Sequence, residues 1–231
     1  MTRQDPVSFF DQQHAENYDA RNERMTPIVG NLHFLMDLVL GDLPDDARIL
    51  SVGVGTGSEI IALAERRLGW TFVALEPSQA MHAKCREKIG TNGLAGRCEC
   101  LNGYLSDLDE GEKFDAVLCL LVTQFILDTA ERQEMFDAMA AHLRPGGYLI
   151  NAEISADIAS PKFDGMVEKW AAMQAQRNMT AEEVSKNISM MKQHVAVVPP
   201  ADIEAMLANS GLSNPTQFFQ SLLIHAWYGR K

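Results

Sequence analysis

Three glycines at alternate positions, Gly53, Gly55 and Gly57, directly follow the short apolar segment 49–52. Glycine accepts positive φ angles and lets the backbone approach a ligand closely. A helical pattern begins at Ser58, and the first turn of a helix offers free N–H groups to an anionic or polar ligand. A strand, a glycine-rich turn and a helix in this order predict a nucleotide-binding turn.

Apolar strand patterns alternate with helical patterns over the first two thirds of the chain, and the connections between them are short. This alternation predicts an α/β fold with a mostly parallel, Rossmann-like sheet and helices on both faces. Two more strands are expected near the C-terminus, as a hairpin, which makes a seven-stranded sheet. The first five strands are expected at 48–53, 70–76, 97–102, 114–121 and 148–154.

The chain of 231 residues is expected to form a single domain in four segments. The 160–196 stretch is helical, rich in Met, Gln and Ala, and interrupts the alternation, which predicts an inserted helical cap. Helices are also expected at 7–20 and 27–41, and a turn at 144–147. The expected segments are N-terminal helices (1–45), a ligand-binding core (46–154), the cap (155–198) and a C-terminal helix with a hairpin (199–231).

Charge and composition narrow the class of partner. The net charge of −11 and the lack of a basic patch disfavour nucleic acid. No apolar run reaches the roughly 18 residues of a membrane span, and the polar N-terminus resembles no signal peptide, so a cytoplasmic protein is expected. The four cysteines lack metal-ligand spacing and predict buried thiols, so no metal is expected.

Glu76 ends the expected second strand, nineteen residues after Gly57. A carboxylate at this position can accept hydrogen bonds from both ribose hydroxyls of a nucleoside. The dinucleotide fingerprint is G-x-G-x-x-G, whereas the glycines here have the shorter spacing G-x-G-x-G. An NAD-dependent reductase is therefore disfavoured.

The motifs resemble class I S-adenosylmethionine (SAM)-dependent methyltransferases, in order across residues 47–154. "VALEPSQAM" resembles the motif that holds the ribose and adenine, "CLNGYLSDL" the loop beside the adenine, and "FDAVLCLLVTQFI" the motif that faces the donor sulfur. "LRPGGYLINAE" resembles the turn and strand that close the core. The resemblance implies SAM as cofactor, S-adenosylhomocysteine (SAH) as product, and these binding residues: Gly53, Gly55, Gly57, Glu76, Pro77, Met81, Gly103, Tyr104, Leu105 and Leu120.

A narrower resemblance is to carboxy-SAM synthases, carried by "TQFILDTAERQEMF" and the Met-rich cap. That family holds an extra carboxylate with a cap arginine, but the corresponding stretch 183–200 has Lys186, Lys192 and His194 and no arginine. A lysine is a point charge and does not replace a bidentate guanidinium. We therefore favour methyl transfer to a small-molecule acceptor. A carboxy-SAM synthase-like enzyme and a non-catalytic SAM or SAH binder are the alternatives.

Two positions depart from the family pattern. Ser51 stands where an acid usually helps to hold the cofactor ammonium group, and Tyr104 stands where an acid often accepts from the adenine amino group. Charge-assisted hydrogen bonds are roughly twice as strong as neutral ones. Compensation is expected from "AENYDARNERMTP", which resembles a segment that folds over the cofactor: Tyr18 would cover its methionine end, and Arg24 or Arg21 would pair with its carboxylate.

Catalytic candidates come from outside the glycine turn. Gln124, after the fourth strand, is placed to orient an acceptor, and His194 in the cap is the candidate general base. Glu153 ends the fifth strand and is expected to face the acceptor. The acceptor itself and the oligomeric state, for which a homodimer is one option, have no sequence signature.

Overall fold

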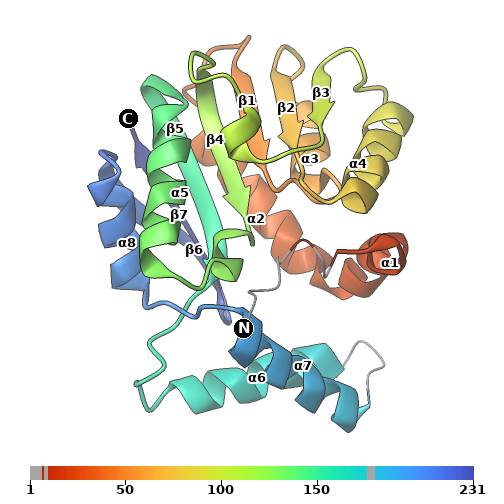
Figure 1. Cartoon of the computed structure of the whole chain (residues 1–231), viewed down its shortest axis with the longest axis vertical. Coiled ribbons are helices and arrows are strands. Elements are labelled where there is room, and N and C mark those ends of the chain that lie inside the picture. Colours follow the sequence, from red (N-terminus) through yellow and green to blue (C-terminus); the bar gives the residue numbers. More distant parts are fainter. Residues whose placement is uncertain (1–6, 8–9, 176–179) are drawn as a thin grey trace.

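A computed structural model describes residue 7, residues 10–175 and residues 180–231. Seven strands form one sheet in the order β3-β2-β1-β4-β5-β7-β6 (Figure 1). The first five strands are parallel, and β7 runs antiparallel to both β5 and β6. The expected fold class is confirmed. The strands are β1 (Arg48–Val52), β2 (Thr71–Leu75), β3 (Cys98–Leu101), β4 (Phe114–Leu120), β5 (Leu143–Ile154), β6 (Ser213–Ser221) and β7 (Ile224–Arg230).

Two apolar clusters divide the core between the faces of the sheet. One contains buried side chains of α2, α3 and α4, and the other contains those of α5 and α8. Burial of such apolar faces supplies most of the folding free energy. These helices span α2 (Thr26–Val39), α3 (Ser58–Arg66), α4 (Gln79–Thr91), α5 (Thr129–Ala141) and α8 (Pro200–Asn209).

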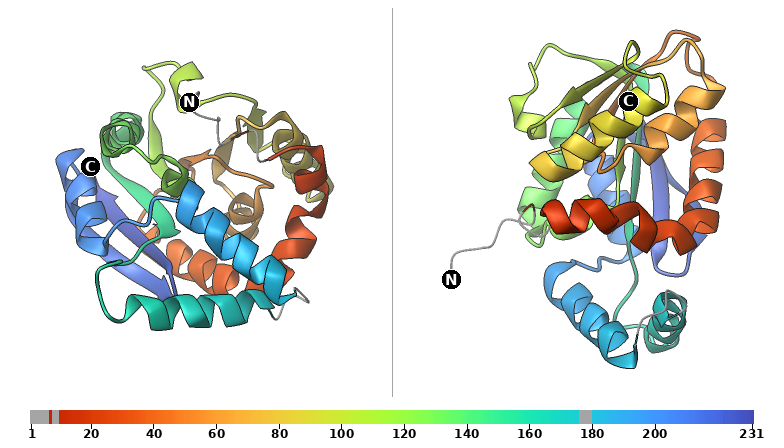
Figure 2. Two further views of the ribbon diagram at one scale, coloured as in Figure 1. Left: turned by 60° about the horizontal axis from the view of Figure 1, so that its bottom comes forward. Right: turned by 90° about the vertical axis from the view of Figure 1, so that its right-hand side faces the viewer.

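The order of the strands reverses between β1 and β4. In open parallel sheets, ligands bind outside the carboxyl ends of the strands at such a reversal. Three helices lie beyond the carboxyl ends of the strands (Figures 1 and 2): α1 (Gln12–Asn22) and the cap helices α6 (Phe163–Ala175) and α7 (Ala181–His194). A ligand site is therefore expected at the carboxyl ends of β1 and β4.

Local boundaries differ from the expectation in two places. The first helix begins at Gln12 instead of residue 7, and the short 3₁₀ helix η2 (Glu23–Met25) joins it to α2. The expected turn at 144–147 is part of β5. Gly146 bends this strand with a φ of 81°, and its N–H still donates to the Lys231 carbonyl, so the strand continues through the bend.

Candidate active site

The glycine turn follows β1 and packs closely against Val122, which follows β4. Gly53, Gly55 and Gly57 have φ angles of 65°, 59° and 81°, in the region that disfavours other residues. A Cβ atom at Gly53 would lie 2.6 Å from Val122 Cγ2, and one at Gly57 would lie 3.0 Å from Cys85 Sγ. The turn therefore requires glycine both for its conformation and for its close packing.

Glu76 is buried directly after β2, with 6% of its surface exposed. The Gly55 N–H donates to Glu76 Oε2 and the Ser78 N–H donates to Oε1, both at 2.9 Å. Burial raises the pKa of Glu76, while these two hydrogen bonds oppose the rise. The carboxylate is thus fixed by backbone donors, and its remaining lone pairs can accept hydrogen bonds from a ligand.

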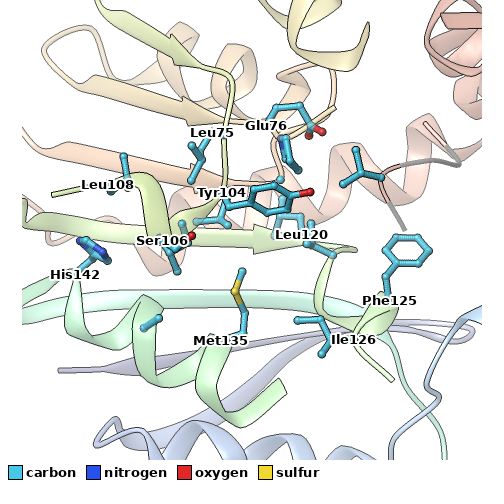
Figure 3. A pocket seen from close by; sticks show the side chains of 18 of the residues that line it. Leu75, Glu76, Tyr104, Ser106, Leu108, Leu120, Phe125, Ile126, Met135 and His142 are labelled. Carbon is cyan, nitrogen blue, oxygen red and sulfur yellow. The ribbon is translucent and has the colours of Figure 1, made fainter. Parts of the chain in front are cut away.

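A cavity of about 950 Å³ opens at the reversal of the sheet (Figure 3). This volume lies in the usual range of small-molecule and cofactor sites. Its lining is mostly apolar, and Glu76 and the Tyr104 hydroxyl add polar groups. The lining includes these expected binding residues: Tyr18, Gly53, Gly55, Glu76, Pro77, Met81, Gly103, Tyr104, Leu105 and Leu120.

The cavity wall beyond β4 is formed by a strained turn. Leu121 has a φ of 61°, an uncommon value for a residue with a side chain, and its N–H donates to the Ala152 carbonyl at 2.6 Å. The next element is the short 3₁₀ helix η4 (Thr123–Phe125). Phe125 packs edge-to-face on Phe10, with 5.7 Å between the ring centroids, and both rings line the cavity.

Ser51 does not line the cavity, and its hydroxyl has a partner that the sequence reasoning missed. Ser51 Oγ donates to Glu59 Oε1 at 2.7 Å. Glu59 is buried in the first turn of α3, and burial raises its pKa to about 7. An acid is therefore present beside β1, supplied by a residue eight positions later. Its place in the first helical turn was the available signal.

The helix that carries Tyr18 is tied to the glycine turn by a cluster of polar side chains. Thr56 Oγ1 donates to Asp19 Oδ1 at 2.9 Å, and Lys88 Nζ donates to Asp19 Oδ2 at 2.9 Å. Lys88 Nζ also contacts Thr56 Oγ1 at 3.1 Å. The side chains of Arg21 and Arg24, expected to hold the cofactor carboxylate, lie outside the part of the structure that is described.

The catalytic candidates are not brought to the cavity. Gln124 is buried, and its Oε1 accepts a hydrogen bond from the Ile154 N–H at 2.8 Å. His194 is half-buried at the end of α7 and is absent from the cavity lining. Glu153, expected to face the acceptor, is fully buried and pairs with Arg132 instead. The Lys192 side chain lies outside the described part.

The described residues contain neither a metal cluster nor a membrane-spanning helix. Within residues 10–175 and 180–231, no group of three His, Cys, Asp or Glu side chains could hold a metal ion. Over the same part of the chain, no helix is long and apolar enough to span a membrane. All four cysteines are free thiols. His142 lines the cavity, and its Nδ1 lies 3.0 Å from the Glu112 carbonyl oxygen.

The fold is the Rossmann-like fold of solved methyltransferases. Residues 49–147 match the family model described as "Methyltransferase domain". The segment that carries the glycine turn, Glu76 and β4 is therefore similar to a methyltransferase domain, and the whole chain shares its fold with solved methyltransferases.

Curated relatives carry a more specific name. The carboxy-S-adenosyl-L-methionine synthase of Methylococcus capsulatus is 24% identical over 217 residues, which cover 91% of this chain and 86% of that protein. Other relatives of the same name, from Campylobacter lari and Nautilia profundicola, are matched over 60% of their length.

Solved structures share the fold at low identity. A putative O-methyltransferase from Nostoc punctiforme has a TM-score of 0.66 and 16% identity, with 90% of this chain and 58% of that chain covered. The magnesium protoporphyrin IX methyltransferase of Synechocystis, with bound SAM, has a TM-score of 0.65 and 16% identity over 100% and 99% of the two chains.

Proposed function

We propose that this protein is a SAM-dependent methyltransferase that acts on a small-molecule acceptor. The observation that carries the proposal is the Glu76 carboxylate. It is fixed by the Gly55 and Ser78 N–H groups and lines the cavity at the reversal of the sheet. A carboxylate held in this way suits the two adjacent hydroxyls of a ribose.

The residues around Glu76 fit the remaining parts of SAM. Met81, Leu105 and the Tyr104 ring supply apolar surface for an adenine. Gly53 and Gly55 present backbone without side chains, and Tyr18 lines the cavity from α1. The Ser51–Glu59 pair supports the proposal, because it adds a buried carboxyl group beside Ser51, the residue that stands where the family usually has an acid.

In this proposal, catalysis depends on positioning the acceptor and on excluding water from the site. When bound, SAM supplies a methyl group on a positively charged sulfur and needs no further activation. The walls formed by Leu120, Leu121 and Val122 would align the acceptor, and the Phe10–Phe125 pair would keep water out. An acceptor that is already deprotonated needs no general base.

The second candidate function is that of a carboxy-SAM synthase. It is supported by similarity to such a synthase over 91% of this chain. This activity requires a cation that can hold the additional carboxylate. The stretch 183–200 contains Lys186, Lys192 and His194 and no arginine. We therefore keep ordinary methyl transfer as the leading proposal.

Native mass spectrometry of the purified protein, followed by titration with SAM, SAH and NAD, tests both candidates. We expect SAM and SAH to bind and NAD not to bind. Co-purified carboxy-SAM would favour the synthase. Tight binding of NAD without SAM would overturn both proposals, and SAM binding without turnover on any of a panel of acceptors would favour a non-catalytic binder.

A further inference from the structure

A buried ion pair lies directly behind the cavity wall. Arg132 of α5 and Glu153 of β5 are 1% and 0% exposed, and Arg132 Nη1 donates to Glu153 Oε1 at 2.9 Å. Removing two charges from water costs several kcal/mol, so a buried pair is weak evidence for stability. A role other than stability is therefore sought for the Arg132–Glu153 pair.

The guanidinium of Arg132 contacts three separate segments. Nε donates to the Ile126 carbonyl at 3.3 Å, Nη1 donates to Glu153, and Nη2 donates to the Ala196 carbonyl at 3.2 Å. Ile126 follows η4 and lines the cavity, whereas Ala196 follows the last helix of the cap. A rigid planar fork can hold three such acceptors at fixed angles.

Glu153 is itself held by two polar neighbours. Thr123 Oγ1 donates to Glu153 Oε2, and Asn151 Nδ2 donates to the same oxygen at 3.1 Å. Thr123 begins η4, so the carboxylate also fixes the start of the segment whose end is bonded to Arg132. Each polar atom in such a network depends on the others.

Gln124 forms a second link between the same segments. Its carbonyl accepts a hydrogen bond from the Ala196 N–H, and its Oε1 accepts one from the Ile154 N–H, both at 2.8 Å. Two residues further on, the Val198 carbonyl accepts from Ser155 Oγ at 2.6 Å. The segment 195–199, which returns from the cap, is therefore bonded to both η4 and the end of β5.

We propose that Arg132 is a positioning residue that fixes the cavity wall and the base of the cap as one unit. Ile126 and Phe125 belong to the wall (Figure 3), and Ala196 belongs to the base of the cap. The cap helices then stand at a set place relative to the cavity, because Arg132 holds both, with the backbone link at Gln124 beside it. The ligand-free form of the protein tests this arrangement, so the inference does not depend on which ligand the cavity takes.

Hydrogen exchange of the full chain without ligand is the experiment. Arg132→Lys keeps the charge beside Glu153 but cannot reach all three acceptors. We expect exchange at the amides of Ile126, Ile154 and Ala196 to rise together by about 10-fold, with the amides of the glycine turn unchanged. Met139→Ala is the matched control. It removes a buried side chain of the same helix, α5, without changing the Arg132–Glu153 pair.

The control separates positioning from a loss of general stability. Met139→Ala should raise exchange through global unfolding, without selecting the three amides. Equal patterns in the two variants, or no rise in Arg132→Lys, would overturn the proposal. Should Arg132→Lys not fold, the double variant Arg132→Met with Glu153→Gln removes all three Arg132 donors without leaving a buried charge unpaired, and the same three amides are followed.

Binding of SAH gives a second readout, which rests on the proposed function. Trp170 is buried in the cap, and the difference in emission between each protein and its Trp170→Phe variant isolates the Trp170 signal from Trp70 and Trp227. We expect SAH to change Trp170 fluorescence in the wild type and to bind Arg132→Lys by calorimetry with a smaller fluorescence change. Failure of SAH to bind the wild type would count against the proposed function alone, since the exchange result stands by itself.

Discussion

Two buried glutamates stand at the same edge of the sheet and have different partners. Glu76 follows β2 and accepts hydrogen bonds from backbone N–H groups, whereas Glu153 lies near the end of β5 and pairs with Arg132 and Thr123. Glu76 lines the cavity and Glu153 does not. Position at a strand end therefore does not make an acid available to a ligand, because side-chain cations and hydroxyls can occupy it first.

The strongest test of this difference is Glu153→Ala. It leaves the Arg132 guanidinium buried without its anion, so we expect a loss of about 3–5 kcal/mol in the free energy of unfolding. Urea denaturation measures the loss, and the exposed Glu87→Ala is the control. A loss no larger than that of the control would mean that water replaces the carboxylate and that the pair is not structural.

Glu76→Ala should act mainly on binding. Two hydrogen bonds that ribose hydroxyls donate to a carboxylate are each worth about 1.5 kcal/mol, so we expect SAH affinity to fall by about 100-fold. Isothermal calorimetry measures the change, again with Glu87→Ala beside it. Unchanged affinity would show that the ribose assignment is wrong, even if SAH binds elsewhere in the cavity.

Glu59 extends the comparison to an acid whose side-chain partner is a neutral hydroxyl. Burial raises its pKa from 4.5 to about 7, so the folded state binds the proton more tightly than the unfolded state. Its contribution to stability is complete below pH 4.5 and is lost as the pH rises to about 7. Glu59→Gln should therefore gain on the order of 2 kcal/mol at pH 8 and little at pH 4.5.

Thermal unfolding across this pH range checks the Glu59 prediction. The exposed Glu65→Gln in the same helix should follow the wild-type pH curve. Parallel curves for Glu59→Gln and the wild type would mean that Glu59 is ionised in the folded protein at neutral pH.

The smallest expected effect concerns the ion pair of Lys88 and Asp19, which is partly exposed. Lys88→Met should lower stability by only about 0.5 kcal/mol, because exposed pairs are screened by solvent. Hydrogen exchange in α1 should nevertheless rise relative to Lys84→Met. A uniform response of the two variants would show that Lys88 does not hold α1 against the glycine turn.

The glycine turn, the place of Glu76 after β2 and the alternating fold could be predicted, because each follows a known pattern of residues along the chain. Glu59 and Arg132 were missed, because no such pattern marks their partners Ser51 and Glu153 on other elements. The expectation that Glu153 faces the acceptor rested on its place in a strand and could not foresee the arginine from α5. Pairing between elements is decided by packing, and one sequence does not display it.

The contact between Gly57 and Cys85 has a practical consequence. Burial raises the pKa of the Cys85 thiol, so little reactive thiolate forms while the turn stays packed against it. Because Cys85 is fully buried beside the turn, a reagent reaches its thiol only when the packing around it opens. The alkylation rate of Cys85, followed by mass spectrometry, therefore measures this opening without knowledge of the substrate.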